Sequence, residues 1–204
     1  MRAEARLADD VPMPPHPTPT TQQPTATRPT VARLETLPPV GSGGVRVRRA
    51  GAPDAVALVR LRAVMLREMG IDVGGDDAPW RRAAEAWFTD QLLGTPTFAA
   101  FVVDEPDLGV VSNAVGVCDQ HAPAPTNPRG LFGHVFNVAT DPRRRRLGYA
   151  RDCMTALLTW FQWETEARVI NLNATSEGLG LYRSLGFDAP HHQALRLRLP
   201  DPPT

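Results

Sequence analysis

The stretch that decides the fold runs over residues 133–162, GHVFNVATDPRRRRLGYARDCMTALLTWFQ. It begins with the mainly apolar residues 134–140, HVFNVAT, whose composition predicts a strand. A turn is predicted at Asp141-Pro142, four arginines follow, and a helix begins around Gly148. The order of strand, basic glycine-containing turn and helix predicts an anion site at the start of the helix.

The predicted helix start suits a phosphate or a pyrophosphate. Backbone N–H groups in the first turn of a helix have no partner within the helix, and the helix dipole adds partial positive charge there. Gly148 and Ala150 carry little or no side chain, so a ligand can lie directly on the backbone. We therefore expect this turn to bind a phosphate-bearing ligand.

Two motifs in this half of the chain resemble a known family. Residues 145–150, RRLGYA, fit [R/Q]-x-x-G-x-[G/A] and resemble the acetyl-CoA pyrophosphate loop of the GNAT N-acetyltransferase superfamily. Residues 179–187, LGLYRSLGF, are similar to a later block of the same family. The alternative, an ordinary strand–helix unit with a solvated basic face, does not account for two motifs in the family's order. The resemblance is specific over 134–151 and 172–187 and covers 45–199 in the order of elements.

The resemblance implies an α/β (α+β) architecture, the GNAT acyl-CoA N-acyltransferase fold, with a central mixed sheet of six or seven strands flanked by helices. Strands 133–140 and 168–174 splay apart in that fold, and the pantetheine arm of acetyl-CoA bonds to the open edge of the first. The patterns in the sequence predict a matching order of elements. The predicted strands are 45–48, 98–103, 110–117, 133–140, 168–174 and 194–199, and the predicted helices are 53–69, 79–94, 147–162 and 177–184.

Two parts are predicted along the chain, a Pro/Thr-rich tail over residues 1–43 and a GNAT N-acetyltransferase domain over 44–200. Nine prolines lie before Val40 among threonines, with hardly a long apolar side chain. Such a segment cannot bury enough surface to offset its conformational entropy, so we expect the tail to be disordered. A docking segment for a partner is the alternative interpretation.

The composition excludes several functional classes. The formal net charge is +0 and no aromatic residues interleave with the basic run, so we expect no nucleic-acid partner. No apolar run reaches the roughly 20 residues of a membrane span, and the N-terminus has no signal-peptide core. We therefore expect a cytoplasmic protein with no membrane partner. The two cysteines, Cys118 and Cys153, form no CxxC pair, and no metal site is expected.

The resemblance also assigns the contacts to acetyl-CoA, the expected cosubstrate. The cofactor-binding residues are then Val138, Ala139, Thr140, Arg145, Arg146, Leu147, Gly148, Tyr149, Ala150, Arg151 and Asn173. Which arginine among residues 143–146 faces a phosphate is left open, and a solvated basic turn is the alternative. Asn137 and Asn173 face the cleft in this interpretation or are purely structural. The chain departs from the family at Thr175, where an asparagine is common. The contact of that asparagine with the cofactor is therefore lost here or made by the threonine hydroxyl.

Two catalytic residues follow from the resemblance. Tyr182 would protonate the leaving thiolate, because a phenol of pKa about 10 is a suitable donor to a thiol of pKa about 8.5. Packing under the cofactor is its alternative role. His134 is the candidate base, where histone-acetylating members carry a glutamate, and a core histidine is the alternative. Period two places His134 on the strand face of Val138, whose backbone N–H would hold the oxyanion.

The acceptor is the least defined part of the site. Acidic residues and two tryptophans cluster around the predicted loop 70–78, namely Glu68, Asp72, Asp76, Asp77, Trp80 and Trp87. Acids beside aromatics suit a cationic amine, with His121 as the opposite wall. A solvated loop beside core tryptophans is the favoured alternative.

These patterns together predict an enzyme. We expect an acetyl-CoA-dependent N-acetyltransferase acting on a primary amine of a small molecule, a peptide or a protein N-terminus, without a metal. A CoA-binding regulatory protein with little or no turnover is the alternative. Whether the protein forms a homodimer is left open.

Overall fold

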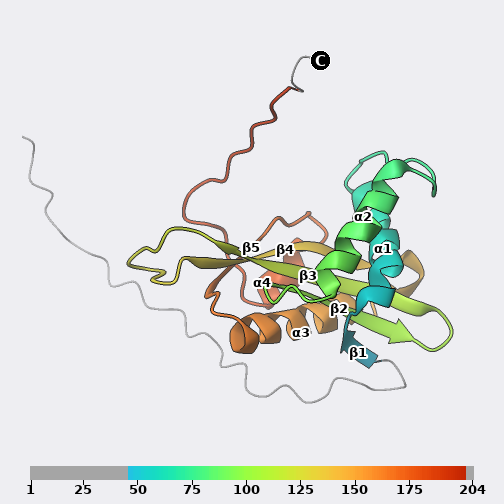
Figure 1. Cartoon of the computed structure of the whole chain (residues 1–204), viewed down its shortest axis with the longest axis horizontal. Coiled ribbons are helices and arrows are strands. Elements are labelled where there is room, and N and C mark those ends of the chain that lie inside the picture. Colours follow the sequence, from blue (N-terminus) through green and yellow to red (C-terminus); the bar gives the residue numbers. More distant parts are fainter. Residues whose placement is uncertain (1–45, 201–204) are drawn as a thin grey trace, which may run out of the picture. The chain divides into compact units, whose positions relative to one another are not determined.

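The computed structural model of the protein describes residues 46–200 (Figure 1). The predicted tail, residues 1–43, lies outside the described residues, so both its disorder and the boundary at residue 44 stay predictions. Among residues 46–200, no helix is both long and apolar enough to cross a membrane.

A mixed five-stranded sheet forms the centre of the described part. Its strands, in the order in which they neighbour one another, are β1 (Arg46–Arg49), β2 (Phe98–Glu105), β3 (Gly109–Gln120), β4 (Leu131–Thr140) and β5 (Val169–Leu172). The strands β1 to β4 pair antiparallel, and β5 pairs parallel to β4. The mixed sheet and the long central strand at 133–140 are therefore confirmed.

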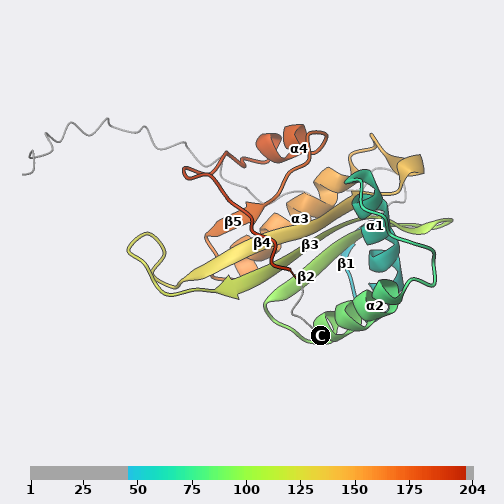
Figure 2. The ribbon, with the colours of Figure 1, turned by 90° about the horizontal axis from the view of Figure 1, so that it is seen from above.

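Helices cover both faces of this sheet (Figures 1 and 2). The helices α1 (Ala55–Glu68) and α2 (Pro79–Leu92) pack on one face, and α3 (Tyr149–Glu164) and the short α4 (Leu179–Ser184) pack on the other. Two short 3-10 helices, η1 (Ala52–Asp54) and η2 (Pro142–Arg144), precede α1 and α3. The predicted α/β arrangement is confirmed, including the helices expected over 53–69 and 79–94.

The packing of α3 against the sheet places the start of this helix at the end of β4. Its apolar residues recur at helical spacing, and the buried ones are Cys153, Met154, Leu157, Trp160 and Phe161. The Phe161 ring lies directly on Gly116 of β3 and Gly133 of β4, where an added Cβ would come within 2.7 Å of the ring. Glycine at both positions therefore lets the helix approach the two central strands closely.

A β-bulge interrupts β4 at Phe136. Asn137 pairs with Val115, and Val135 pairs with the next residue of β3, Gly116, so Phe136 has no partner in β3. A bulge inserts one residue into a strand and changes the face on which the following side chains lie. Side chains before and after Phe136 therefore do not follow a single period of two.

The sheet has five strands within residues 46–200, rather than the expected six or seven. Residues 194–199, ALRLRL, alternate as a strand should, but they pair with no strand in the described part of the chain. Leu195, Leu197 and Leu199 are 88%, 83% and 79% exposed. The prediction of this strand is wrong because alternation determines only which side chains share a face. A strand also needs an edge to bond to.

Candidate active site

The pairing between β4 and β5 ends halfway along β4, where β5 itself ends. Their parallel pairs run from Phe132–Val169 to Val135–Leu172 and stop there. Beyond this point, residues 136–140 of β4 have β3 on one side and no described strand on the other. The pairing thus ends where β5 ends, which leaves an open edge on β4, and the splay expected between the two strands stays a prediction.

The backbone of Val138 faces this open edge. The carbonyl groups of Asn137 and Ala139 accept hydrogen bonds from β3 side chains at 3.1 Å, and the Asp141 N–H donates to a β3 carbonyl. Backbone groups of successive strand residues point to opposite edges, so those of Val138 and Thr140 point away from β3. The carbonyl of Ala139 is turned to β3 and its side chain is buried in the core, so neither group faces the open edge, and the predicted cofactor contact of this residue stays untested.

A cavity of about 360 Å³ lies along the open edge. It is bounded by the C-terminal half of α1, by β4, by the chain after β5 and by α4. Its lining includes Met65, Glu68, His134, Val138, Asn173 and Tyr182. Both predicted catalytic residues and two of the predicted cofactor-binding residues are thus brought together, although they come from distant parts of the chain. We call this space the edge cavity.

Tyr182 reaches the edge cavity from α4. Its ring packs edge-on against Phe187, with ring centroids 6.1 Å apart. Burial alone raises the pKa of the Tyr182 phenol, without a contribution from any hydrogen bond. The phenol therefore stays protonated at neutral pH, and its O–H is available to donate into the cavity.

His134 stacks on Phe136, with ring centroids 6.2 Å apart and planes 7° from parallel. The expectation that His134 shares a strand face with Val138 is wrong, because the bulge lies between them. Phe136 packs toward α1 and α2, whereas Val138 packs toward α3. Both His134 and Val138 nevertheless line the edge cavity.

The turn between β4 and α3 presents backbone groups rather than side chains. Asp141 Oδ1 accepts a backbone N–H of η2 at 3.0 Å, which closes the turn. Arg146 (φ 64°) and Gly148 (φ 88°) adopt left-handed conformations, and no side chain caps the first turn of α3. A Cβ on Gly148 would meet nothing within 4 Å. The first N–H groups of α3 are therefore open to a ligand, as an anion site requires.

The other predicted loop residues also leave this turn accessible. Leu147 is exposed, and Tyr149 and Ala150 are the first residues of α3. The Tyr149 ring packs against the core beneath α3, and its hydroxyl contacts Glu105. The Tyr149 side chain therefore points away from the backbone N–H groups of the loop and does not cover them.

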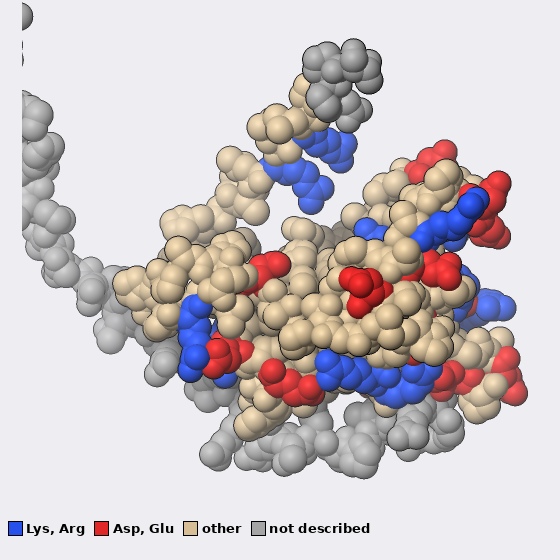
Figure 3. All heavy atoms as spheres, viewed as in Figure 1, with Lys and Arg blue, Asp and Glu red and all other residues tan. Residues whose placement is uncertain are grey.

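Three of the four consecutive arginines are held by carboxylates. The pairs are Arg143–Asp141 at 2.9 Å, Arg144–Glu105 at 2.8 Å and Arg145–Glu68. Figure 3 shows arginine and carboxylate side chains lying next to one another over one face. Arg146 has no carboxylate partner among residues 46–200, so it is the arginine of the run that is free to meet a phosphate. Arg151 of α3 donates to Ser184 Oγ at 2.8 Å.

Thr175 stands where the family commonly has an asparagine. It lines the edge cavity together with Asn173. Its Oγ1 accepts the Gly178 N–H at 3.2 Å, just before α4 begins. The hydroxyl is therefore engaged in shaping the start of α4, which carries Tyr182.

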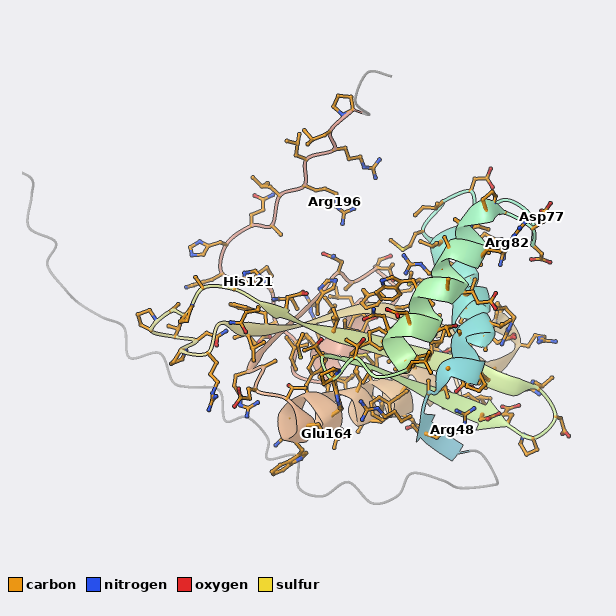
Figure 4. The ribbon with its side chains drawn as sticks, viewed as in Figure 1. Arg48, Asp77, Arg82, His121, Glu164 and Arg196 are labelled. Atoms are coloured by element: carbon orange, nitrogen blue, oxygen red, sulfur yellow. The ribbon has the colours of Figure 1, made fainter. Side chains whose placement is uncertain are left out.

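The acidic residues and tryptophans near α2 do not converge on one site. Asp76 is exposed and pairs with an arginine of α2, and Trp80 donates its Nε1–H to a loop carbonyl at 2.8 Å. Asp77 and His121 lie at opposite ends of the described ribbon (Figure 4). The loop is solvated, as in the favoured alternative, but the tryptophans are not core residues, because Trp80 is only partly buried and Trp87 is 44% exposed.

Several residues that line the edge cavity were not predicted from the sequence as site residues, among them Arg62 and Phe136. Both line the edge cavity and also a second cavity of about 340 Å³ beside α2. Arg62 lies on the buried stripe of α1, four residues after Leu58 and three before Met65. A charged residue on an apolar stripe is the sequence signal that would have found it. Phe136 gives no such signal, because the bulge depends on pairing with β3.

Comparisons with known proteins agree with this geometry. The model of the acetyltransferase (GNAT) family matches residues 75–187. A predicted acetyltransferase from Clostridium acetobutylicum, solved with acetyl-CoA, is similar with a TM-score of 0.66 at 23% identity, over 76% of this chain and 96% of that one. A GCN5-related N-acetyltransferase from Ralstonia eutropha JMP134 has a TM-score of 0.62 at 21% identity, over 76% and 99% of the two chains.

An aminoglycoside acetyltransferase from an uncultured soil metagenomic sample, in complex with trehalose, also has this fold. Its TM-score is 0.56 at 14% identity, over 76% of this chain and 95% of that one. At these identities the similarity concerns the fold alone. No curated protein matches the sequence.

Proposed function

This chain belongs to the GNAT acetyltransferase family, and we propose that it is an N-acetyltransferase using acetyl-CoA as donor and a primary amine as acceptor. The acceptor amine belongs to a small molecule or a protein N-terminus. One observation carries the proposal. The open edge of β4 leads from the edge cavity, which holds Tyr182, to the uncapped N-terminus of α3.

The residues along this path fit the donor. The pantetheine arm would bond to the backbone groups of Val138 and Thr140, and the pyrophosphate would lie on the first N–H groups of α3. No carboxylate occurs among residues 145–150 to repel the phosphates. The open space in front of Gly148 admits them, and Arg146 adds a positive charge.

The chemistry follows from the side chains that meet in the edge cavity. The neutral amine attacks the thioester carbonyl, a C–N bond forms, and the Val138 N–H donates a hydrogen bond to the oxyanion. The C–S bond then breaks, and Tyr182 gives its proton to the leaving thiolate. His134 takes the proton that the amine loses, directly or through water. The products are an N-acetylated amine and free CoA thiol.

A screen of primary amines with acetyl-CoA, read by release of free thiol, tests this function. We expect at least one class of amines to raise the rate of thiol release well above acetyl-CoA hydrolysis. Mass spectrometry should show one acetyl group added per acceptor. If acetyl-CoA binds and no amine is acetylated, a CoA-binding regulator without turnover replaces this proposal.

A further inference from the structure

Arg62 differs from the other arginines that are partly buried. Among the described side chains these arginines are Arg48, Arg60, Arg62, Arg81 and Arg144. Four of the five hold a carboxylate at 2.7 Å to 3.3 Å. Arg62 has no carboxylate partner in the described part of the chain.

The guanidinium of Arg62 is a half-buried cation with a single weak protein partner. Its Nη1 donates to Asn137 Oδ1 at 3.4 Å, which is long for a hydrogen bond. Burial lowers the pKa of this guanidinium, and no neighbouring carboxylate counteracts the effect. Arginine keeps its charge in proteins. Its other N–H donors therefore have no carboxylate partner in the described part of the chain, whereas each of the other four partly buried arginines has one.

Arg62 stands where two cavities meet. The edge cavity lies on one side, and the second cavity, of about 340 Å³, lies on the other. Apart from Arg62, the second cavity is lined by the apolar residues Ala84, Trp87, Phe88, Val117 and Phe136. Trp87 and Phe136 stand edge-on to each other, with ring centroids 6.0 Å apart. This aromatic pocket thus offers apolar walls and one positive charge.

We propose that Arg62 binds the carboxylate of the acceptor, which makes the substrate class a free α-amino acid with an apolar side chain. The planar guanidinium fork matches a carboxylate, and the aromatic pocket takes the side chain. Asn137, the partner of Arg62, directly precedes Val138. A carboxylate on Arg62 therefore brings an amine one carbon away close to the edge where the thioester would lie. This inference rests on the proposed function.

A phosphate of the donor is the alternative anion for Arg62. The backbone turn that suits phosphates lies at the start of α3, after the end of β4. Arg62 instead contacts Asn137, next to the bulge in the middle of β4. Its position favours the acceptor, and a change in donor affinity is one of the outcomes that would overturn the proposal.

The experiment assays three sets of acceptors on the wild-type protein and measures the rate of thiol release for each acceptor. They are the apolar L-amino acids, their carboxamides, and the corresponding amines without a carboxyl group, such as L-phenylalanine, L-phenylalaninamide and 2-phenylethylamine. We expect at least one acid to exceed its amide in kcat/KM by about 10- to 100-fold, the range of a hydrogen-bonded charge. Amides that equal or exceed their acids throughout would overturn the proposal.

Arg62→Gln removes the charge and leaves a neutral amide on the same face of α1. It should abolish the preference for the acids mainly through KM, and Arg62→Lys should restore part of it. Arg82→Gln is the matched control, because Arg82 is an exposed arginine of α2 outside both cavities (Figure 4). It should keep the preference. If Arg62→Gln weakens acetyl-CoA binding instead, Arg62 serves the donor and the proposal is wrong.

A binding measurement keeps this inference separate from the proposed function. 3-Phenylpropionate carries the ring and the carboxylate but no amine, so its binding needs no turnover. Calorimetry should show about tenfold weaker binding, or none, to folded Arg62→Gln than to the wild type and Arg82→Gln. Equal binding to all three, or none to the wild type, would overturn the inference. An absence of acetyl transfer to any amine would overturn only the proposed function.

Discussion

Val135 of β4 pairs with Leu172 of β5, and this is the last pair between the two strands. The next residue of β4, Phe136, is the bulge. The strand thus loses its partner at the point where its side-chain alternation shifts. Both effects act on Val138, whose backbone is left facing an open edge beside the edge cavity. The proposed chemistry depends on this junction.

Tyr182→Phe removes the proposed proton donor and keeps the ring, so folding and acetyl-CoA affinity should change little. Acid catalysis typically contributes about 10²- to 10⁴-fold, and kcat should fall within that range. Burial raises the pKa of the phenol above its usual value near 10. Ionisation of Tyr182 should therefore limit the wild type only at strongly alkaline pH, and that limb should be missing in the variant.

Tyr149→Phe is the matched control for this experiment, because Tyr149 is the other tyrosine of the chain and its hydroxyl contacts Glu105. Its kcat should remain close to the wild-type value. Wild-type kcat in Tyr182→Phe, with chemistry shown to be the slow step, would make Tyr182 a packing residue.

Asp141→Asn should lower the free energy of unfolding at neutral pH. The Arg143 guanidinium beside Asp141 holds the pKa of that carboxyl well below its usual range, with further help from the backbone N–H of Arg143 and from Arg60. The folded pKa lies below the unfolded value of about 3.9, so this stabilisation is present above that pH and is lost as pH falls through the folded pKa.

Urea unfolding of the wild type and Asp141→Asn at several pH values between about 2 and 7 measures the difference. It should be largest above about pH 5 and shrink steadily below about pH 4. Asp77→Asn, in the exposed loop before α2, should match the wild type throughout. A constant difference across the whole range would contradict a role for the charge of Asp141.

Gly133→Ala should destabilise the fold. The added Cβ would lie 2.7 Å from the Phe161 ring and 3.1 Å from Ile170, and Phe161 is fully buried. Overpacking of this kind costs about 1–3 kcal/mol. Thermal unfolding should show the loss, and Phe161→Leu in the same chain should recover part of it.

Gly180→Ala in α4 is the control for the glycine change, since its Cβ would meet nothing within 4 Å. It should leave the free energy of unfolding unchanged or raise it by up to about 1 kcal/mol. If both alanines behave alike, the close approach of α3 to β4 is not what requires glycine at position 133.

The sequence predicted those parts of the fold that local patterns determine. The strand, turn and helix around Gly148 could be predicted because each is encoded by adjacent residues. The faces taken by His134 and Ala139 could not be, since they depend on the bulge at Phe136 and on pairing with β3. The strand expected at 194–199 failed for the same reason, because pairing partners are not part of a local pattern.

The sequence also could not predict which carboxylate pairs with which arginine. Four consecutive arginines appear equivalent along the chain, but carboxylates from α1, from β2 and from the turn itself bind three of them. Only Arg146 remains free in the described part. Arg62 presents the opposite case, because its place on the apolar stripe of α1 could have been noticed before the structure was known.

Calorimetric titration of the wild type and Gly148→Glu with acetyl-CoA tests the central claim most directly. A glutamate here would put bulk and negative charge where the pyrophosphate is to lie. Gly109→Glu is the matched control, because Gly109 also has a left-handed φ, of 67° against 88°, with no atom within 4 Å of an added Cβ. The account predicts one acetyl-CoA per chain for the wild type and for Gly109→Glu, and at least tenfold weaker binding to folded Gly148→Glu. Equal affinity in all three proteins, or no binding to the wild type, would contradict it.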